Sequence, residues 1–341
     1  MTDLLLNSFT ERFRNGRNAP EEDAGSLLDA MITSGDEALL GSLLSAWNSK
    51  GIAAEEIYSI AAVMRSRCQR LSSPYEIFVD IVGTGGSRAK TFNVSTAAAF
   101  VVAGAGVPVA KHGNKAASSR SGSADVLTSL GIKADIEPAV AEECLKQVGI
   151  CFMFAPKYHR LSPALAAARR KIGAPTIFNC VGPLCNPANV PVQVIGVWDK
   201  GLIDPVAAAL AKLGTTRSWV VHAESGLDEI AAAGCTFVAE VAGGKISRYE
   251  VGPTDFGLRE FPVVERGPAI PEESADVILG ILAGQTQFPA VRSLVVMNAA
   301  AAIYLAGRAE TLTEASELAL RSIESGNALD KLKRLAAATN Q

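Results

Sequence analysis

The spacing of apolar residues predicts helices through about the first 70 residues. The segments Ala24 to Thr33, Glu37 to Lys50 and Ala53 to Cys68 each carry apolar side chains at intervals of three or four. A glycine separates each segment from the next, at a place where helices commonly end. No strand pattern interrupts this region, so residues 1–72 are expected to form a small helical domain.

The pattern changes after Pro74, where short apolar runs begin to alternate with helical segments. Strands are predicted at 78–82, 107–110, 150–154, 192–197, 218–222 and 236–241. Helices are predicted at 95–104, 138–147, 162–172, 205–213, 272–283, 290–305 and 313–325. Alternation with short connections is typical of an α/β domain with a largely parallel sheet, here expected over residues 73–341.

Composition narrows the class of protein. Of the 341 residues, 48% are hydrophobic and 20% are charged, which is typical of a folded chain of about two domains and excludes global disorder. The formal net charge of −3 argues against a nonspecific binder of nucleic acid or anionic membranes, since both depend on clustered positive charge.

The chain also lacks the marks of an exported or membrane protein. Its longest apolar run, Ala97 to Ala110, is shorter than the roughly 20 residues of a membrane span and contains two glycines and a proline. The N-terminus has no signal-peptide core, and the six scattered cysteines form no CxxC pair. We therefore expect a cytoplasmic protein with reduced, mostly buried thiols.

Candidate chemistry begins with Gly83-Thr84-Gly85-Gly86, directly after the first predicted strand. Such a turn lets backbone N–H groups approach an anion, although a simple tight turn would look the same. The dinucleotide pattern GxGxxG fails because residue 88 is Arg88, and the Walker A pattern fails at Thr84 and Ala89. A phosphate site here would belong to another class.

Two further polar segments strengthen the phosphate interpretation. Thr91 to Thr96 lies where an alanine-rich helix begins, so its hydroxyls either cap the helix or surround an anion and a Mg²⁺ ion. Lys111 to Lys115 follows the second predicted strand, and Ser118 to Ser123 follows soon after. Lys111, Lys115 and Arg120 in these loops suit a polyphosphate. The alternative is a solvated basic loop.

The order and spacing of GTGG, TFNVST, KHGNK and SGSADVL closely resemble the anthranilate phosphoribosyltransferase family. The resemblance covers nearly the whole chain and includes KGIAAEEIYSIAAVMR, TIFN-VGPL-NP at 176–187, GLDE at 226–229 and DFGL at 255–258. It implies a fold of the nucleoside phosphorylase and phosphoribosyltransferase type. In this fold a helical domain, with a contribution from about 160–190, joins a large α/β domain and forms a homodimer.

The same resemblance implies an activity. Phosphoribosyl pyrophosphate (PRPP) and anthranilate would give N-(5-phosphoribosyl)anthranilate and pyrophosphate, a step of tryptophan biosynthesis, with Mg²⁺ as cofactor. The amine of anthranilate is itself the nucleophile, so no covalent intermediate with the enzyme is needed and no catalytic residue is assigned.

Carried over position by position, the resemblance implies three sets of binding residues. The donor would be held by Gly83, Gly86, Ser87, Thr91, Asn93, Val94, Ser95, Thr96, Lys111, His112, Gly113, Asn114, Lys115, Ala116, Ala117, Ser118, Ser119 and Ser123. Anthranilate would be held by Gly83, Asn114, His159, Arg169 and Pro183. The metal ion would be held by Ser95, Asp228 and Glu229.

The residue types suit these roles. Pyrophosphate accumulates charge as it leaves, and lysines and Mg²⁺ stabilise that charge. Asp228 and Glu229 offer the oxygen ligands that Mg²⁺ prefers, although adjacent acids are often only surface charge. An arginine such as Arg169 suits the carboxylate of anthranilate. His222 is expected to be a core histidine outside the site.

Three departures from the family pattern keep alternatives open. Ser87 stands where the family usually has an acidic residue, Lys115 replaces an arginine, and the segment from Arg160 to Pro163 differs from the family's. The last departure leaves open a related phosphoribosyltransferase with another aromatic acceptor. A noncatalytic relative that binds nucleic acid is disfavoured by the net charge and by the intact Asp228-Glu229 pair. A pyrimidine nucleoside phosphorylase is disfavoured by the short chain and its missing phosphate loop.

Overall fold

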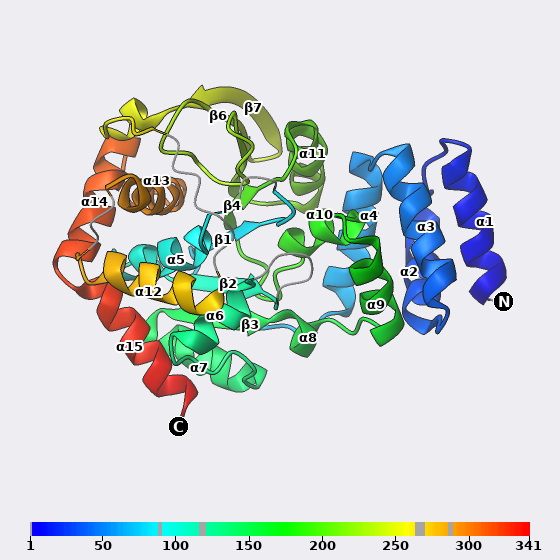
Figure 1. Ribbon diagram of the computed structural model, residues 1–341, viewed down its shortest axis with the longest axis horizontal. Helices are drawn as coiled ribbons and strands as arrows, with labels where there is room; N and C mark the ends of the chain where they lie inside the picture. The colour runs from blue at the N-terminus through cyan, green and yellow to red at the C-terminus, as the bar shows by residue number, and fades with distance from the viewer. Residues whose placement is uncertain (1, 88–90, 116–120, 263–269, 286–288) are drawn as a thin grey trace.

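A central sheet of seven strands organises the computed structural model, which describes residues 2–87, 91–115, 121–262, 270–285 and 289–341 (Figure 1). The strand order is β3-β2-β1-β4-β5-β6-β7. The first five strands in the chain pair in parallel, and β6 and β7 pair antiparallel at one edge. The bounds are β1 Val79–Gly83, β2 Val109–Gly113, β3 Ile150–Phe154, β4 Val192–Gly196, β5 Arg217–Ala223, β6 Thr236–Ala242 and β7 Lys245–Val251. The predicted α/β class with a mostly parallel sheet is confirmed.

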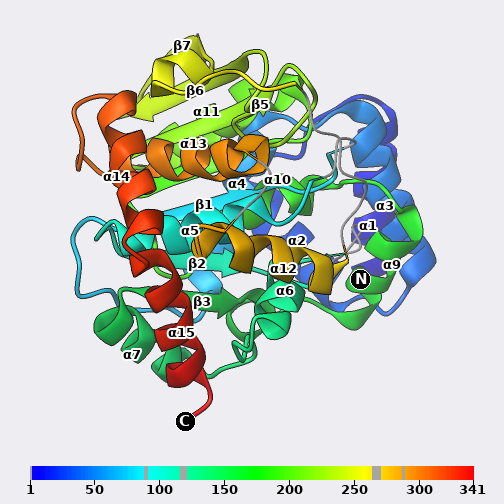
Figure 2. The same ribbon diagram turned by 60° about the vertical axis from the view of Figure 1, so that its left-hand side comes forward.

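One face of the sheet is covered by helices from the middle and the end of the chain (Figure 2). Their apolar side chains form one core with residues such as Val194 and Trp219 of the sheet. The bounds are α5 Val94–Gly104, α6 Ser123–Ser129, α7 Pro138–Val148, α12 Pro271–Leu282, α13 Pro289–Leu305, α14 Leu312–Glu324 and α15 Asn327–Thr339.

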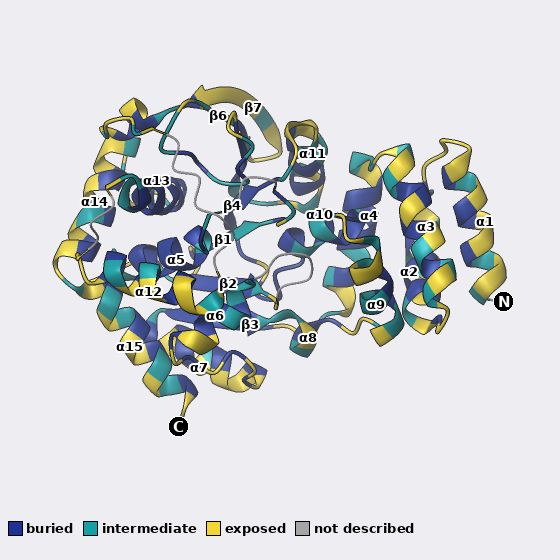
Figure 3. Cartoon of the chain, viewed as in Figure 1, coloured by how far each residue is buried: buried dark blue, intermediate teal, exposed yellow. Residues whose placement is uncertain are grey.

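A second core lies on the opposite face and continues into the helical end of the molecule (Figures 1 and 3). Ile195 belongs to this core while its neighbour Val194 belongs to the first, because successive strand residues point to opposite faces. The contributing helices are α1 Thr2–Arg14, α2 Ala24–Thr33, α3 Glu37–Lys50, α4 Ala54–Arg67, α9 Pro163–Ile172, α10 Ile177–Leu184 and α11 Ile203–Leu213. Short helices are η1 Glu21–Asp23, α8 Ala155–Tyr158, η2 Lys200–Leu202 and η3 Pro253–Phe256. The domain boundary at residue 72 stays a prediction.

The second strand differs from its prediction in a way that matters for the site. It runs from Val109 to Gly113 and not from 107 to 110, so Lys111 and His112 belong to the strand and not to a loop after it. Both side chains are buried. The parallel pairing of Val109–Gly113 with β3 explains this extension, since it continues to Phe154.

Two general expectations can be compared with the structure. No helix in the described part of the chain is long and apolar enough to span a bilayer. All six cysteines are free, and Cys144, Cys151, Cys180 and Cys185 are buried.

Candidate active site

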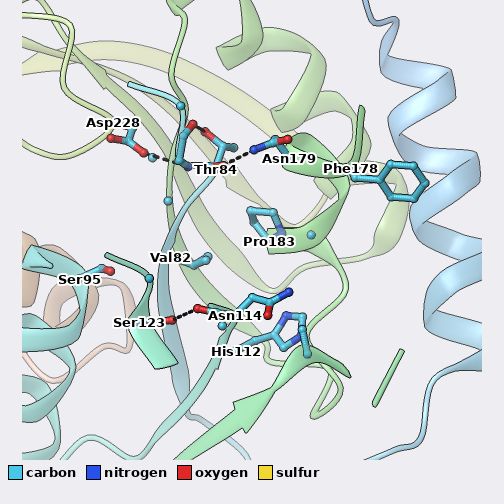
Figure 4. A pocket seen from close by; sticks show the side chains of 18 of the residues that line it. Val82, Thr84, Ser95, His112, Asn114, Ser123, Phe178, Asn179, Pro183 and Asp228 are labelled. Atoms are coloured by element: carbon cyan, nitrogen blue, oxygen red, sulfur yellow. Dashed lines mark hydrogen bonds between the residues drawn. The ribbon is translucent and has the colours of Figure 1, made fainter. Parts of the chain in front are cut away.

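A cavity of about 740 Å³ opens where β1, β2 and β4 end, between the sheet and helices α9 and α10 (Figure 4). The carboxyl ends of parallel strands are the usual position for a ligand in such folds. Among the predicted residues, the cavity is lined by Gly83, Gly86, Ser87, Thr91, Asn93, Ser95, Lys111, His112, Gly113, Asn114, Lys115, Ser123, His159, Arg169, Pro183, Asp228 and Glu229.

A few predicted residues lie elsewhere. Val94 and Thr96 are buried in helix α5 and do not line the cavity. Ala116, Ala117, Ser118 and Ser119 lie outside the described residues. His222 also lies outside the lining, and its Nδ1 donates to the carbonyl oxygen of Val197 at 2.8 Å, as expected for a satisfied core histidine.

The glycine-rich turn at the end of β1 is fixed by backbone bonds. Thr84 N donates to the carbonyl oxygen of Gly196 at 2.8 Å, and Trp198 N donates to Thr84 Oγ1 at 3.1 Å. Gly86 has a φ of 83°, and a Cβ placed there would lie 2.4 Å from the Cγ atom of Pro175. Only glycine fits this position, so the turn brings its backbone close to α10 and the cavity.

Lys111 is a buried cation among the residues predicted to bind the donor. Its Nζ donates to the carbonyl oxygen of Ile81 at 2.5 Å and to Ser95 Oγ at 3.3 Å, and Ser95 lies in the first turn of α5. Burial lowers the pKa of Lys111, and the carboxylates of Asp80 and Glu229 oppose this shift. A lysine beside the N-terminus of an α-helix suits a polyanionic ligand.

The two acids lie on the loop after β5 and face the glycine turn. Asp228 accepts a hydrogen bond from Gly85 N at 3.1 Å, and Glu229 accepts one from Thr91 Oγ1 at 3.2 Å. A Cβ on Gly196 would lie 1.7 Å from the carbonyl oxygen of Asp228, so the loop depends on a glycine there. The sequence places the acids side by side, and the fold places both in the cavity.

The electrostatics of the acids fit a cation. Burial raises the pKa of both carboxyls, and the charge of Asp228 raises the pKa of Glu229 further. Neither acid forms an ion pair within the described residues. Together with Ser95 they offer only oxygen donors, which is the set that Mg²⁺ prefers. The described residues contain no group of three or more His, Cys, Asp or Glu side chains suited to a metal. Further ligands would therefore have to come from substrate or water.

The remaining donor-side residues connect neighbouring loops. Ser87 Oγ donates to the carbonyl oxygen of Gly226 at 2.7 Å and so joins the glycine turn to the acidic loop. Ser121 Oγ donates to Asn93 Oδ1 at 2.8 Å, and Ser123 Oγ donates to the carbonyl oxygen of Asn114 at 3.4 Å. The hydroxyls predicted to bind phosphate are thus also used to shape the cavity wall.

Two histidines meet in the cavity wall. The ring centroids of His112 and His159 lie 5.2 Å apart, although the resemblance placed the two in different binding sets. His159 Nε2 lies 2.9 Å from the carbonyl oxygen of Cys185, which can only accept, so Nε2 carries the proton. Burial lowers the pKa of both imidazoles, that of His112 to about 3. Both rings are therefore neutral near pH 7.

Arg169 on α9 is the cation among the residues predicted to bind anthranilate. Its guanidinium lies 5.2 Å from the ring centre of Phe178, and its Nη2 donates to Asn179 Oδ1 at 3.4 Å. Burial lowers the pKa of Arg169 to about 10, which leaves it charged at neutral pH. Arg170 is exposed and lies outside the cavity lining, whereas Arg160 lines the cavity.

Several lining residues had no role predicted from the sequence. Thr84 lies in the GTGG segment, and Phe178 and Asn179 lie in the TIFN segment. Asn298 lies on α13, and its side chain bonds both the N–H and the carbonyl oxygen of Ile230, at 3.1 and 2.9 Å. It thereby holds the loop that carries the acids. No local pattern around Asn298 indicates this role.

Similarity to known proteins identifies the family of this chain. The family described as "Glycosyl transferase family, a/b domain" matches residues 75–329. Among curated relatives, an anthranilate phosphoribosyltransferase of Pelotomaculum thermopropionicum is 44% identical over 332 residues, 97% of this chain and 96% of the relative. That of Rhodopseudomonas palustris is 43% identical, covering 98% of each chain. The chain belongs to the anthranilate phosphoribosyltransferase family.

Solved structures agree with this assignment. The anthranilate phosphoribosyltransferase of Thermus thermophilus superposes with a TM-score of 0.87 at 35% identity, covering 98% of this chain and 99% of the other. The Saccharomyces cerevisiae protein, in complex with PRPP and Mg, superposes with a TM-score of 0.88 at 27% identity, covering 99% and 98%. The same yeast protein has also been solved in complex with 4-fluoroanthranilate.

Proposed function

We propose that this chain transfers the phosphoribosyl group of PRPP to the amine of anthranilate, giving N-(5-phosphoribosyl)anthranilate and pyrophosphate. One observation carries the proposal. A single cavity holds both a set of groups suited to a polyphosphate and, across from it, a half-buried arginine beside an aromatic ring. A transferase of this kind must hold two substrates in contact, and each half of the cavity suits one of them.

The donor would occupy the side formed by the glycine turn, the start of α5 and Lys111. Backbone N–H groups of the turn, the N-terminus of α5 and the ammonium group are donors directed at one volume. Ser95, Asp228 and Glu229 would hold Mg²⁺, which when bound neutralises charge on the pyrophosphate oxygens. The remaining predicted donor residues in the lining would contact the phosphates and the ribose.

Anthranilate would occupy the side formed by His159, Arg169 and Pro183, with Gly83 and Asn114 at the boundary. The guanidinium of Arg169 would pair with the carboxylate and so orient the amine towards C1 of the ribose. The new bond joins the amine nitrogen to C1, and the C1–O bond breaks with its electron pair leaving on pyrophosphate. The amine nitrogen, now positively charged, then loses a proton to pyrophosphate or to water.

The two histidines would act as neutral hydrogen-bonding groups in this step. Because His159 donates from Nε2, its Nδ1 is left as an acceptor. His112 Nε2 is buried without a hydrogen-bond partner among the described residues. Neutral imidazoles do not compete with Arg169 for the carboxylate of the acceptor, and they leave the amine uncharged.

We also propose an oligomeric state, a cellular location and a pathway for the enzyme. The family resemblance supports a homodimer formed through the helical domain, residues 1–72 with a contribution from about 160–190. It also supports a cytoplasmic location and a place in tryptophan biosynthesis. Sedimentation of the purified chain would test the dimer directly.

The experiment that tests the proposal follows the fluorescence of anthranilate. The purified chain should remove that fluorescence only when both PRPP and Mg²⁺ are present. A different aromatic acceptor is the competing hypothesis. It is favoured by the segment 160–163, which differs from the family pattern and contributes Arg160 and Leu161 to the cavity lining. Consumption of PRPP with another aromatic amine but not with anthranilate would support that alternative and refute the proposal.

A further inference from the structure

The side chain of Asn179 lies between the two halves of the cavity, and none of the roles described above includes it. It belongs to the first turn of α10, is half-buried and lines the cavity near Thr84 (Figure 4). A side chain in this position can influence both substrates without belonging to either predicted binding set.

Its hydrogen bonds fix the orientation of the amide. Oδ1 accepts from the backbone N–H of Thr176 at 3.0 Å and from Arg169 Nη2 at 3.4 Å. Nδ2 donates to the carbonyl oxygen of Thr84 at 3.0 Å. The opposite orientation would direct the amide NH₂ at two donors and the amide oxygen at a carbonyl oxygen, so only one orientation satisfies all three partners.

The groups that Asn179 joins come from distant parts of the chain. Thr84 is the second residue of the glycine turn, and the next residue, Gly85, donates to Asp228. Arg169 is the cation proposed to bind the acceptor carboxylate. One amide therefore connects the turn beside the donor and acidic loop with the arginine on α9.

We propose that Asn179 is a positioning residue that sets the distance between the donor turn and Arg169, and thereby aligns the acceptor amine with C1 of the donor. This inference rests on the proposed function, since it assumes that the two sides hold the two substrates. Alignment matters because small displacements of reacting groups cost large factors in rate. Asn179 touches neither reacting atom in this account and acts through Thr84 and Arg169.

Two substitutions of Asn179 test its hydrogen bonds to Thr84 and Arg169. Asn179→Ala removes all three bonds and should raise the KM for anthranilate and the KM for PRPP roughly 10-fold each and lower kcat roughly 10-fold, the size expected for a hydrogen bond to a charged group. Asn179→Asp keeps an acceptor for Thr176 N and Arg169 but cannot donate to Thr84. It also places a carboxylate against Arg169 that competes with the carboxylate of anthranilate, so it should raise the KM for anthranilate at least as much as Asn179→Ala does and raise the KM for PRPP roughly 10-fold.

A control substitution of the same kind is available far along the chain. Asn340 donates two amide-to-carbonyl bonds, to Gly131 and Ala336, and lies outside the cavity lining. Asn340→Ala should leave kcat and both KM values unchanged. Melting temperatures of all three variants would show whether each is folded.

The results distinguish positioning from helix capping. If Asn179 only caps α10, Asn179→Ala will lower the melting temperature and both KM values will stay at wild-type values, which would overturn the inference. Unchanged KM values for PRPP in Asn179→Asp would also overturn it. Absence of turnover in the wild-type chain would instead refute the proposed function, so the two failures cannot be confused.

Discussion

At the scale of single residues, Arg169 and Arg170 show how the fold separates two neighbours of the same type. Both occupy the last turn of α9, yet only Arg169 enters the cavity, where it lies over Phe178. Sequence alone left the alternative of a solvated arginine open, because the helical face of each residue depends on what α9 packs against. The structure therefore gives a substitution at Arg169 a matched control at its neighbour.

Arg169→Ala should raise the KM for anthranilate about 10- to 150-fold, because a hydrogen bond to a charged group contributes about 1.5–3 kcal/mol. The KM for PRPP should change little, since the donor lies on the other side of the cavity. Steady-state kinetics with each substrate varied in turn would measure both constants. Arg170→Ala should affect neither, and an equal effect of the two substitutions would place the acceptor elsewhere.

Asp80 offers a pH-dependent test of the buried floor under the site. It is 0% exposed, accepts a hydrogen bond from Asn186 Nδ2 at 2.8 Å, and burial raises its pKa to about 6. In the unfolded chain the pKa of an Asp carboxyl is near 3.9, so Asp80 loses its proton at a lower pH there than in the folded chain. The free energy of unfolding should therefore fall by about 2 kcal/mol between pH 4 and pH 7 through this group alone.

Asp80→Asn keeps an oxygen for Asn186 but cannot ionise. Relative to wild type, its free energy of unfolding should rise by about 2 kcal/mol from pH 4 to pH 7. Urea unfolding of both proteins across that range would measure the difference. Two curves that stay parallel would contradict the raised pKa of Asp80.

At the scale of elements, the sequence predicted most helices and strands of the α/β part to within a few residues, because buried parallel strands are short and apolar. Helices α6, α8 and α15 were not predicted, but two other missed elements have clear physical reasons. Strand β7 is an edge strand whose residues are mostly exposed, so it lacks an apolar run. Helix α10 contains Gly182 and Pro183, which argue locally against a helix but are tolerated by its packing against α4.

The candidate site was predictable to a similar degree. Motifs on single loops, such as the glycine turn and the acid pair, could be read from the chain. Asn179 and Asn298 could not, because their roles arise only when α10 meets the turn and α13 meets the acidic loop. The strand position of Lys111 was wrong because a polar residue near the end of a buried strand resembles a loop.

The close packing of β4 against the acidic loop gives a prediction at this scale. Gly196→Ala would place a Cβ 1.7 Å from the carbonyl oxygen of Asp228, so the loop must move. We expect loss of Mg²⁺-dependent turnover and a destabilisation of about 1–3 kcal/mol. Thermal melting and the anthranilate fluorescence assay would measure the two effects.

Gly280→Ala is the matched control for that substitution. Gly280 lies within α12, and a Cβ there meets nothing within 4 Å. Alanine should stabilise the helix by about 0.5–1 kcal/mol and leave turnover unchanged. Equal loss of turnover in both variants would show that the contact with Asp228 is not the cause.

At the scale of the whole molecule, the cavity lies where the two cores meet. The sheet and α5 line the side proposed for the donor, and α9 and α10, which belong to the second core, line the side proposed for the acceptor. The acidic loop joins them from β5. If both substrates and Mg²⁺ bind in this cavity, Asp228 and Glu229 must bind the metal ion and must not be needed for packing.

Asp228→Asn combined with Glu229→Gln tests that requirement. Neutral amides preserve the shape but remove two half-buried charges whose pKa values are raised by burial. Turnover should be lost at every Mg²⁺ concentration, while the melting temperature at pH 8 should stay equal or rise. Turnover close to wild type at low Mg²⁺ would exclude the acids as metal ligands.

The most direct test of the central claim is a crystal structure of the chain with anthranilate, pyrophosphate and Mg²⁺, a combination that cannot react because it contains no ribose. Both ligands should lie in one cavity. Pyrophosphate should lie between Lys111 and the Asp228-Glu229 loop, and the anthranilate carboxylate should lie within hydrogen-bonding distance of Arg169. Anthranilate bound away from Arg169, or pyrophosphate bound away from Asp228 and Glu229, would contradict the proposed placement of the two substrates.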